Sequence, residues 1–215
     1  MGLETALMSN GDVFADIAGK YDRINRVLSL GRDDNWRRQV VDRLPDGSIL
    51  DVGAGTGAAN GAFAGRGVVA LDPSAAMLGR NDASHRVVAT GERLPFVSEV
   101  FDAVFSAFVF RNLASVDATV SEMARVLKPG GKAGVVDLGR PPGKLASRLH
   151  RAGTAVVLGG VGVAAGARSE YRYLHRSLDK LPGPEALFAD GALRLEEVWR
   201  MGPLGFVYGA ILGHR

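Results

Sequence analysis

The stretch Ser48-Ile49-Leu50-Asp51-Val52-Gly53-Ala54-Gly55-Thr56-Gly57 decides the fold of this chain. The residues up to Val52 form a nearly continuous apolar run, which is typical of a strand buried on both faces of a parallel sheet. From Gly53 to Gly57, glycine stands at every other position, so the backbone can turn tightly and approach a ligand where a Cβ atom would clash. The stretch therefore predicts a buried strand that leads into a ligand-binding loop.

Similar apolar runs alternate with helical patterns along the rest of the chain. Strands are predicted at residues 48–53, 67–72, 85–89, 100–108 and 132–139, with two more at 193–201 and 205–212. Helices are predicted at residues 56–65, 73–80 and 115–131, with two more within 12–44 that would lie over the sheet. Ser115 can cap the helix at 115–131, and Pro129-Gly130-Gly131 would stop it. This order predicts an α/β fold with a doubly wound, mostly parallel sheet and an antiparallel hairpin at its edge.

The composition is that of one globular domain, because the 215 residues are 47% hydrophobic and 23% charged. Cysteine is absent, which excludes disulfides, thiolate metal ligands and a cysteine nucleophile. The N-terminus lacks the charged-then-apolar pattern of a secretion signal, and the apolar stretch Ala152–Ala167 is too short for a spanning helix. We therefore predict a cytoplasmic protein.

Charge is distributed unevenly along the chain. Residues 1–137 hold 15 Lys and Arg against 17 Asp and Glu, a net of −2, whereas residues 138–215 hold 11 against 6, a net of +5. No run of basic residues interleaved with aromatic ones is present, so we expect no nucleic-acid partner. A basic and apolar C-terminal third suits an anionic ligand or a peripheral contact with a membrane surface.

Asp72 ends the second predicted strand, 21 residues after Asp51. A carboxylate at that point can accept hydrogen bonds from both hydroxyls of a ribose. Together with the glycine loop, it predicts a nucleoside-bearing cofactor at the carboxyl ends of the strands. Two alternatives stay open on this pattern. One is a dinucleotide, because Gly53-x-Gly55-x-x-Ala58 also satisfies the dinucleotide fingerprint, and the other is a glycine turn that only packs a helix on a strand.

Asp51 helps to separate these cofactors, because a carboxylate at the loop entrance would attract an ammonium group and repel a pyrophosphate. With Asp72-Pro73-Ser74 and the later Thr90-Gly91-Glu92, the pattern resembles the class I S-adenosylmethionine-dependent methyltransferases, which have a Rossmann-like fold. The resemblance implies S-adenosylmethionine as the cofactor. The residues that it implies for cofactor binding are Asp51, Gly53, Gly55, Thr56, Gly57, Asp72, Pro73, Thr90, Gly91, Ser106 and Ala107.

The flanks of this core resemble the ubiquinone/menaquinone biosynthesis C-methyltransferase family. The resemblance rests on Tyr21-Asp22-Arg23-Ile24-Asn25, Leu28-Ser29, Trp36-Arg37-Arg38, Phe110-Arg111-Asn112-Leu113 and Tyr171-Arg172-Tyr173-Leu174. The chain departs from the family pattern at Ile24, Asp33, Asp137, Gly139 and Ile211. Because of these departures, the sequence leaves the quinol head group and the length of its prenyl chain undecided.

The resemblance implies methyl transfer from a sulfonium to a ring carbon of a prenylated hydroquinone, either demethylmenaquinol or a ubiquinol precursor. Arg111 would stabilise a phenolate and Asn112 would hydrogen-bond a ring oxygen, so both are predicted to be catalytic. Tyr21 and Asn25 would line a lid over the cofactor. The alternatives are a structural pair that caps the loop for the first two, and ordinary helix packing for the second two. The four histidines show no ligand spacing, so we expect no metal.

The chain is predicted to be one methyltransferase domain with four parts. These are a helical lid at 1–44, a cofactor-binding core at 45–139, a helical substrate cover at 140–190 and edge strands at 191–215. The sequence leaves the oligomeric state open, a homodimer included. Three further functions stay open: an O- or N-methyltransferase for small molecules, a NAD-dependent oxidoreductase, and a non-catalytic cofactor-binding subunit of a quinone-synthesis complex. A quinol C-methyltransferase is the function that we favour.

Overall fold

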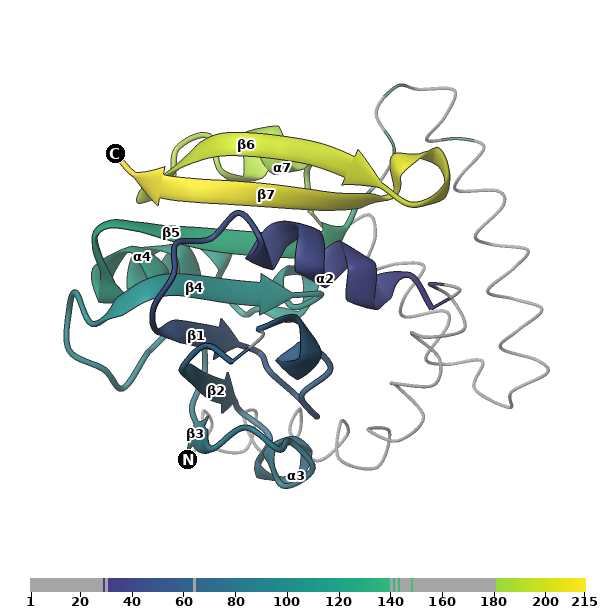
Figure 1. Cartoon of the computed structure of the whole chain (residues 1–215). Helices are drawn as coiled ribbons and strands as arrows, with labels where there is room; N and C mark the ends of the chain where they lie inside the picture. Colours follow the sequence, from purple (N-terminus) through teal and green to yellow (C-terminus); the bar gives the residue numbers. More distant parts are fainter. Residues whose placement is uncertain are drawn as a thin grey trace, which may run out of the picture.

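The computed structural model of the chain describes residues 29, 31–63, 65–139, 141, 143, 148 and 181–215. Within them, a seven-stranded sheet has the order β3-β2-β1-β4-β5-β7-β6 (Figure 1). Its strands are β1 (Ile49–Val52), β2 (Val68–Asp72), β3 (His85–Val88), β4 (Phe101–Ala107), β5 (Leu127–Leu138), β6 (Leu193–Met201) and β7 (Val207–His214). The strands β1 to β5 run parallel, and β7 pairs antiparallel with both β5 and β6. The predicted α/β fold with an antiparallel edge hairpin is confirmed.

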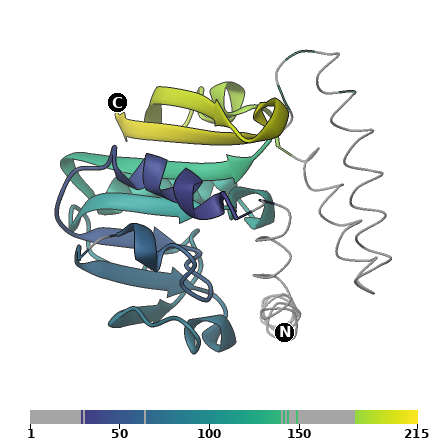
Figure 2. The ribbon, with the colours of Figure 1, turned by 45° about the vertical axis from the view of Figure 1, so that its right-hand side comes forward.

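Helices pack on both faces of this sheet. Among the described residues, the α-helices are α2 (Asp33–Val41), α3 (Ala75–Leu78), α4 (Val116–Val126) and α7 (Pro184–Leu187), and the short 3-10 turns are η1 (Asn60–Ala62), η2 (Phe110–Asn112) and η3 (Pro203–Gly205). In Figures 1 and 2, α2 crosses one face of the sheet while α4 lies behind the other. The sheet is therefore the middle layer of three.

The alternation of side chains along the strands builds a separate core on each face. Leu50 of β1 packs in one core with Met123 of α4. Its neighbour Ile49 packs in the other core with Val40 of α2. Asp51, two residues after Ile49, belongs by this alternation to the face that α2 covers. This placement becomes important at the functional site.

The helix α4 follows the predicted pattern at its start and departs from it at its end. The Oγ atom of Ser115 accepts a hydrogen bond from the backbone N–H of Ala118 at 3.2 Å, so the predicted cap is confirmed. Met123 and Val126 are fully buried against the sheet. The helix ends at Val126 because Leu127 is already extended and begins β5. The helix therefore ends before the predicted stop at Pro129-Gly130-Gly131, which belongs to β5 together with Leu127 and Lys128.

The helix predicted over residues 56–65 is also wrong. Only the 3-10 turn η1 forms there, after a series of turns that follow the glycine loop. Gly57 has a φ of +89°, which a right-handed helix does not accommodate, and its N–H closes a turn on the carbonyl of Ala54. Glycine-rich sequence also has low helix propensity, so the local sequence favours turns.

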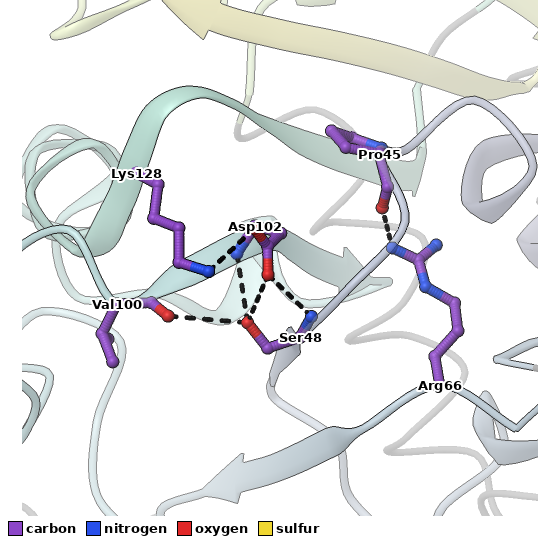
Figure 3. Close-up of polar contacts among 6 residues, drawn as sticks. All are labelled: Pro45, Ser48, Arg66, Val100, Asp102 and Lys128. Atoms are coloured by element: carbon purple, nitrogen blue, oxygen red, sulfur yellow. Dashed lines mark hydrogen bonds and ion pairs between the residues drawn. The ribbon is translucent and has the colours of Figure 1, made fainter.

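A polar cluster joins three strands at the amino end of the sheet, opposite the glycine loop (Figure 3). The carboxylate of Asp102 accepts hydrogen bonds from the backbone N–H of Ser48 at 2.9 Å and from its hydroxyl at 2.8 Å. Lys128 pairs with the same carboxylate at 2.8 Å. The hydrogen bonds from Lys128 and then Ser48 lower the pKa of Asp102 to about 2. These contacts connect the starts of β1, β4 and β5, and on the same edge Arg66 contacts the carbonyl of Pro45.

Some of the predicted architecture lies outside the described residues. The first of the two helices predicted within 12–44 falls there, as does most of the cover predicted at 140–190, of which residues 141, 143, 148 and 181–190 are described. In the part of the chain that the structure describes, no helix has the length and apolar character needed to cross a membrane.

Candidate functional site

A cavity of about 260 Å³ opens at the carboxyl ends of β1, β2 and β4. This is the edge at which doubly wound sheets bind their ligands. The loops after these strands form most of the wall, and α2 and the loop after β3 complete it. The predicted site residues on this wall are Asp51, Gly53, Gly55, Thr56, Asp72, Pro73, Thr90, Gly91, Ala107 and Asn112. The structure thus brings together residues from five segments of the sequence.

The glycine loop is shaped by backbone conformations that other residues rarely adopt. Gly53 has a φ of +77°, and a Cβ atom at this position would collide with the side chain of Val109 from the loop after β4. A Cβ atom on Gly57 would likewise be too close to the side chains of Asn60 and Asn81. The loop therefore passes closely between two neighbouring segments, and only glycine permits this path.

Asp72 supports the glycine loop and also faces the cavity. One of its carboxylate oxygens accepts a hydrogen bond from the N–H of Gly55 at 3.0 Å, and the other accepts one from the N–H of Ser74 at 2.8 Å. Burial raises the pKa of Asp72, although these two hydrogen bonds oppose the shift. Because a carboxylate oxygen has two lone pairs, each oxygen can still accept a hydrogen bond from a ribose hydroxyl.

Asp51 is the least satisfied polar group on the wall. Its carboxylate is buried, and its Oδ2 atom has no hydrogen-bond partner among the described residues. Burial raises the pKa of Asp51 to about 7, even though the charge of Arg37 acts in the opposite direction. A buried carboxylate without a donor is costly, so the site is suited to a ligand that brings a cation. The α-ammonium group of S-adenosylmethionine meets this requirement, and a pyrophosphate does not.

The loop after β3 forms the side of the cavity next to α4. A Cβ atom on Gly91 would meet the side chains of Thr119 and Val52, so the backbone lies directly on this wall. Glu92 accepts hydrogen bonds from the backbone N–H groups of Ala114 at 2.9 Å and Ser115 at 3.4 Å. These bonds join the loop after β3 to the loop that leads into α4, which fixes the width of the cavity at this end.

Two of the residues predicted to bind the cofactor lie behind the wall instead of on it. Ser106 is buried in β4 and donates its hydroxyl hydrogen to the carbonyl of Val52 at 2.9 Å. Gly57 packs against Asn60 and Asn81, as described above. Both lie directly behind residues of the cavity wall, and neither is among the residues that line the cavity. Tyr21 and Asn25 lie outside the described residues.

Sequence reasoning missed two residues that shape the site. Asn81 is buried, and its side-chain amide donates to the carbonyl of Gly55 at 3.2 Å and accepts from the N–H of Ala83 at 2.9 Å. It therefore connects the turn before β3 to the glycine loop. Arg37 is buried in α2 and reaches the cavity wall. The sequence signal for Arg37 was its place in the block Trp36-Arg37-Arg38, which carries part of the family resemblance, and for Asn81 there was none.

Arg111 and Asn112 have different surroundings although they are adjacent. Asn112 lines the cavity. Arg111 is buried behind it and pairs with the buried Asp137 of β5, with 3.4 Å between Nη1 and Oδ1. The other carboxylate oxygen of Asp137 accepts a hydrogen bond from the N–H of Phe110 at 2.9 Å, so η2 is held against β5. Burial raises the pKa of Asp137, and the charge of Arg111 opposes this shift.

Among the described residues, no group of three or more His, Asp or Glu side chains is arranged to hold a metal ion. The residues that line the site suit a ligand that consists of a nucleoside with a charged amino-acid tail. Asp72 suits a ribose, and the orphaned carboxylate of Asp51 suits an ammonium group.

A family model matches residues 7–190, which is most of the sequence. The chain belongs to the ubiE/COQ5 methyltransferase family. It is a methyltransferase, and its cofactor is S-adenosylmethionine. The carboxylates of Asp72 and Asp51 suit the ribose and the ammonium group of this cofactor. The resemblance and the Rossmann-like fold inferred from the sequence are both confirmed.

Similar proteins agree with this assignment. A demethylmenaquinone methyltransferase from Thermus thermophilus is 36% identical over 193 residues, which cover 82% of this chain and 88% of the relative. A ubiquinone/menaquinone biosynthesis C-methyltransferase from Geobacter sulfurreducens is 35% identical over 192 residues, which cover 81% of this chain and 75% of the relative.

Solved structures share the fold at lower identity. A SAM-dependent methyltransferase from Thermotoga maritima has a TM-score of 0.67 and 17% identity, over 95% of this chain and 99% of the other. A SAM-dependent methyltransferase from Aquifex aeolicus has a TM-score of 0.60 and 17% identity, over 92% and 97%.

Proposed function

We propose that this enzyme methylates a ring carbon of demethylmenaquinol. The observation that carries the proposal is the set of relatives, which are 36% identical over four fifths of the chain and are named demethylmenaquinone methyltransferases. A ubiquinol precursor is the second candidate, because the Geobacter sulfurreducens relative is named for both quinones.

The reaction requires alignment, removal of a proton and exclusion of water. The cofactor supplies an electrophilic methyl group on a sulfonium. The hydroquinone becomes a nucleophile when a ring hydroxyl loses its proton, and the ring carbon then forms the new bond while the sulfur keeps the electron pair of the broken one. The hydrogen on that carbon leaves as a proton, which restores the aromatic ring. This chain has to hold the ring beside the methyl group and stabilise the charge on its oxygen.

Asn112 is the residue that we place on the ring oxygen. It lines the cavity after β4, and its amide can donate a hydrogen bond to a phenolate. Arg111 we assign to positioning, because its guanidinium pairs with Asp137 and holds η2 in place. We expect Asn112→Ala to lower kcat about a hundredfold, as the removal of an oxyanion donor does in other enzymes. The affinity for S-adenosylhomocysteine should change little, and an equal loss in both would show that Asn112 serves the cofactor.

The substrate assignment is tested with two reduced quinols that carry short prenyl tails. The purified enzyme is incubated with S-adenosylmethionine carrying a labelled methyl group and with demethylmenaquinol, a demethylated ubiquinol precursor or a simple aromatic amine. We expect labelled methyl on a ring carbon of demethylmenaquinol, which the NMR spectrum of the product distinguishes from an O-methyl group. Methylation at oxygen or nitrogen, or turnover of the amine alone, would contradict the proposal.

We also propose that the enzyme works at the cytoplasmic surface of the membrane, because a prenyl chain keeps the quinol in the bilayer. Support comes from the sequence of residues 140–176, most of which lie outside the described residues. This segment holds seven Lys and Arg against Glu170. Each basic residue near an anionic surface contributes about 1 kcal/mol. We expect salt-sensitive sedimentation with anionic vesicles that weakens in Arg148→Glu/Arg151→Glu, whereas indifference to vesicle charge would contradict the proposal.

A further inference from the structure

Arg37 brings a buried positive charge to the cofactor cavity. Its side chain is only 5% exposed, yet it lines the cavity from α2. Its guanidinium carbon lies 5.3 Å from the centre of the Phe108 ring, which belongs to the loop after β4. Asp51 lies on the face of the sheet that α2 covers, because Ile49, two residues before it, packs with Val40 of α2. Arg37 and Asp51 therefore line the cavity from the same face of the sheet.

The guanidinium is held through one of its three nitrogens. Its Nη1 atom pairs with Asp33 at 2.7 Å and with Asp34 at 3.5 Å. Asp33 is itself held by the hydroxyl of Ser29, which donates to it at 2.8 Å. Although burial alone would raise the pKa of Asp33, hydrogen bonds from Arg37 and Ser29 bring it below its usual value. The polar contacts of Arg37 with the described residues thus leave the N–H groups on Nε and Nη2 to serve a ligand.

The charges on the cavity wall indicate which group of a ligand Arg37 can bind. Among the described residues that line the cavity, Asp51, Asp72 and Glu92 are acidic and Arg37 alone is basic. A ligand carboxylate placed anywhere else on this wall would face carboxylates without a compensating cation. The amino-acid end of S-adenosylmethionine carries one ammonium and one carboxylate group. Asp51 and Arg37 offer one opposite charge to each.

We infer that Arg37 binds the α-carboxylate of S-adenosylmethionine, while Asp51 binds the α-ammonium group beside it. Arginine is suited to this task because its planar guanidinium can donate two parallel hydrogen bonds to a carboxylate. Asp33 then acts as a positioning residue, since it fixes Nη1 and so sets the direction of the remaining donors. The inference concerns the cofactor alone and does not depend on the identity of the quinol.

A comparison of two ligands tests this inference without measuring activity. S-adenosylhomocysteine carries both the ammonium and the carboxylate on a thioether, whereas decarboxylated S-adenosylmethionine keeps the ammonium and the methylsulfonium and lacks the carboxylate. The comparison is therefore made for each ligand between the variant and the wild type. Arg37→Met removes the charge and keeps most of the apolar stem. Calorimetry should show that this variant binds S-adenosylhomocysteine about tenfold to a hundredfold more weakly, while its affinity for the decarboxylated ligand changes less than about threefold.

Arg38→Met is the matched control, because Arg38 is the next residue of the same helix, carries the same charge and is exposed. It should leave both affinities unchanged. An equal loss for both ligands in Arg37→Met, or no loss for either, would overturn the inference. Where Arg37→Met does not fold, Arg37→Lys and Asp33→Asn provide the same comparison, and a loss confined to S-adenosylhomocysteine supports the inference while an equal loss overturns it. Failure to methylate a quinol would leave these binding ratios as they are, so the two proposals fail separately.

Discussion

Asp51 should make cofactor binding depend on pH in the neutral range. The change to consider is Asp51→Asn, which keeps the shape of the side chain and removes its charge. In the cofactor-free protein, burial raises the pKa of Asp51 to about 7, and Arg37 and Asp72 act on it in opposite directions. The ammonium group of the cofactor stabilises the charged form of Asp51, so binding requires that the carboxyl group lose its proton.

The size of the effect follows from this pKa. A group that titrates at about 7 is ionised to about 75% at about pH 7.5 and to about 3% at about pH 5.5, so the affinity should fall about twentyfold over this interval. At the higher pH, Asp51→Asn should lose a hydrogen bond between two charged groups, worth about 1.5–3 kcal/mol, or about tenfold to a hundredfold in affinity. At the lower pH the wild type and Asp51→Asn should bind the cofactor with almost equal affinity.

Calorimetry with S-adenosylhomocysteine in buffers of different ionisation enthalpy measures both the affinity and the number of protons released. Below pH 7 the wild type should release close to one proton on binding, and Asp51→Asn should release none from this site. Equal pH profiles for the two proteins would refute the assignment of Asp51 to the ammonium group.

The same substitution should stabilise the cofactor-free protein. Because the pKa of Asp51 is raised on folding, the folded chain holds a proton that the unfolded chain has lost between about pH 4 and pH 7. Stability is therefore lost as the pH rises through this window. Asp51→Asn avoids the loss, so its melting temperature should exceed that of the wild type above pH 7 and approach it near pH 4. A lower melting temperature at pH 8 would contradict this reasoning.

Three further substitutions have outcomes that the structure predicts. Asp72→Asn should weaken S-adenosylhomocysteine binding at least about tenfold by calorimetry, because a neutral amide holds both the ribose and Gly55 less strongly. Asp102→Asn should lower the melting temperature at neutral pH. Since the pKa of Asp102 is lowered to about 2, this difference should be lost as the pH falls through that value. Arg111→Met should lower the free energy of unfolding in urea by about 3–5 kcal/mol because it leaves Asp137 buried without its cation, and Arg111→Met/Asp137→Leu should recover most of the loss.

The sequence by itself determined the sheet and the cofactor loop of this protein. Both depend on signals that lie close together along the chain. Continuous apolar runs indicate buried parallel strands wherever they occur, and alternate glycines at 53–57 permit one kind of turn. Asp72 could be assigned because a parallel strand brings its last residue to the same edge as the glycine loop. The antiparallel hairpin of β6 and β7 followed from two short strands that flank Gly202-Pro203, and its register came only from the structure.

Only the tertiary structure decided which charged side chains meet. Asp51 and Arg37 are 14 residues apart in the sequence and reach the same cavity because α2 packs on the face of the sheet to which Asp51 points. Arg111 lies in η2 after β4 and Asp137 in the neighbouring strand β5, and their pairing places Arg111 behind the cavity wall while Asn112 remains on it. Packing in three dimensions sets these distances, and the energy of a buried charge depends on its neighbours in space. Local sequence patterns contain the identities of such residues but not the distances between them.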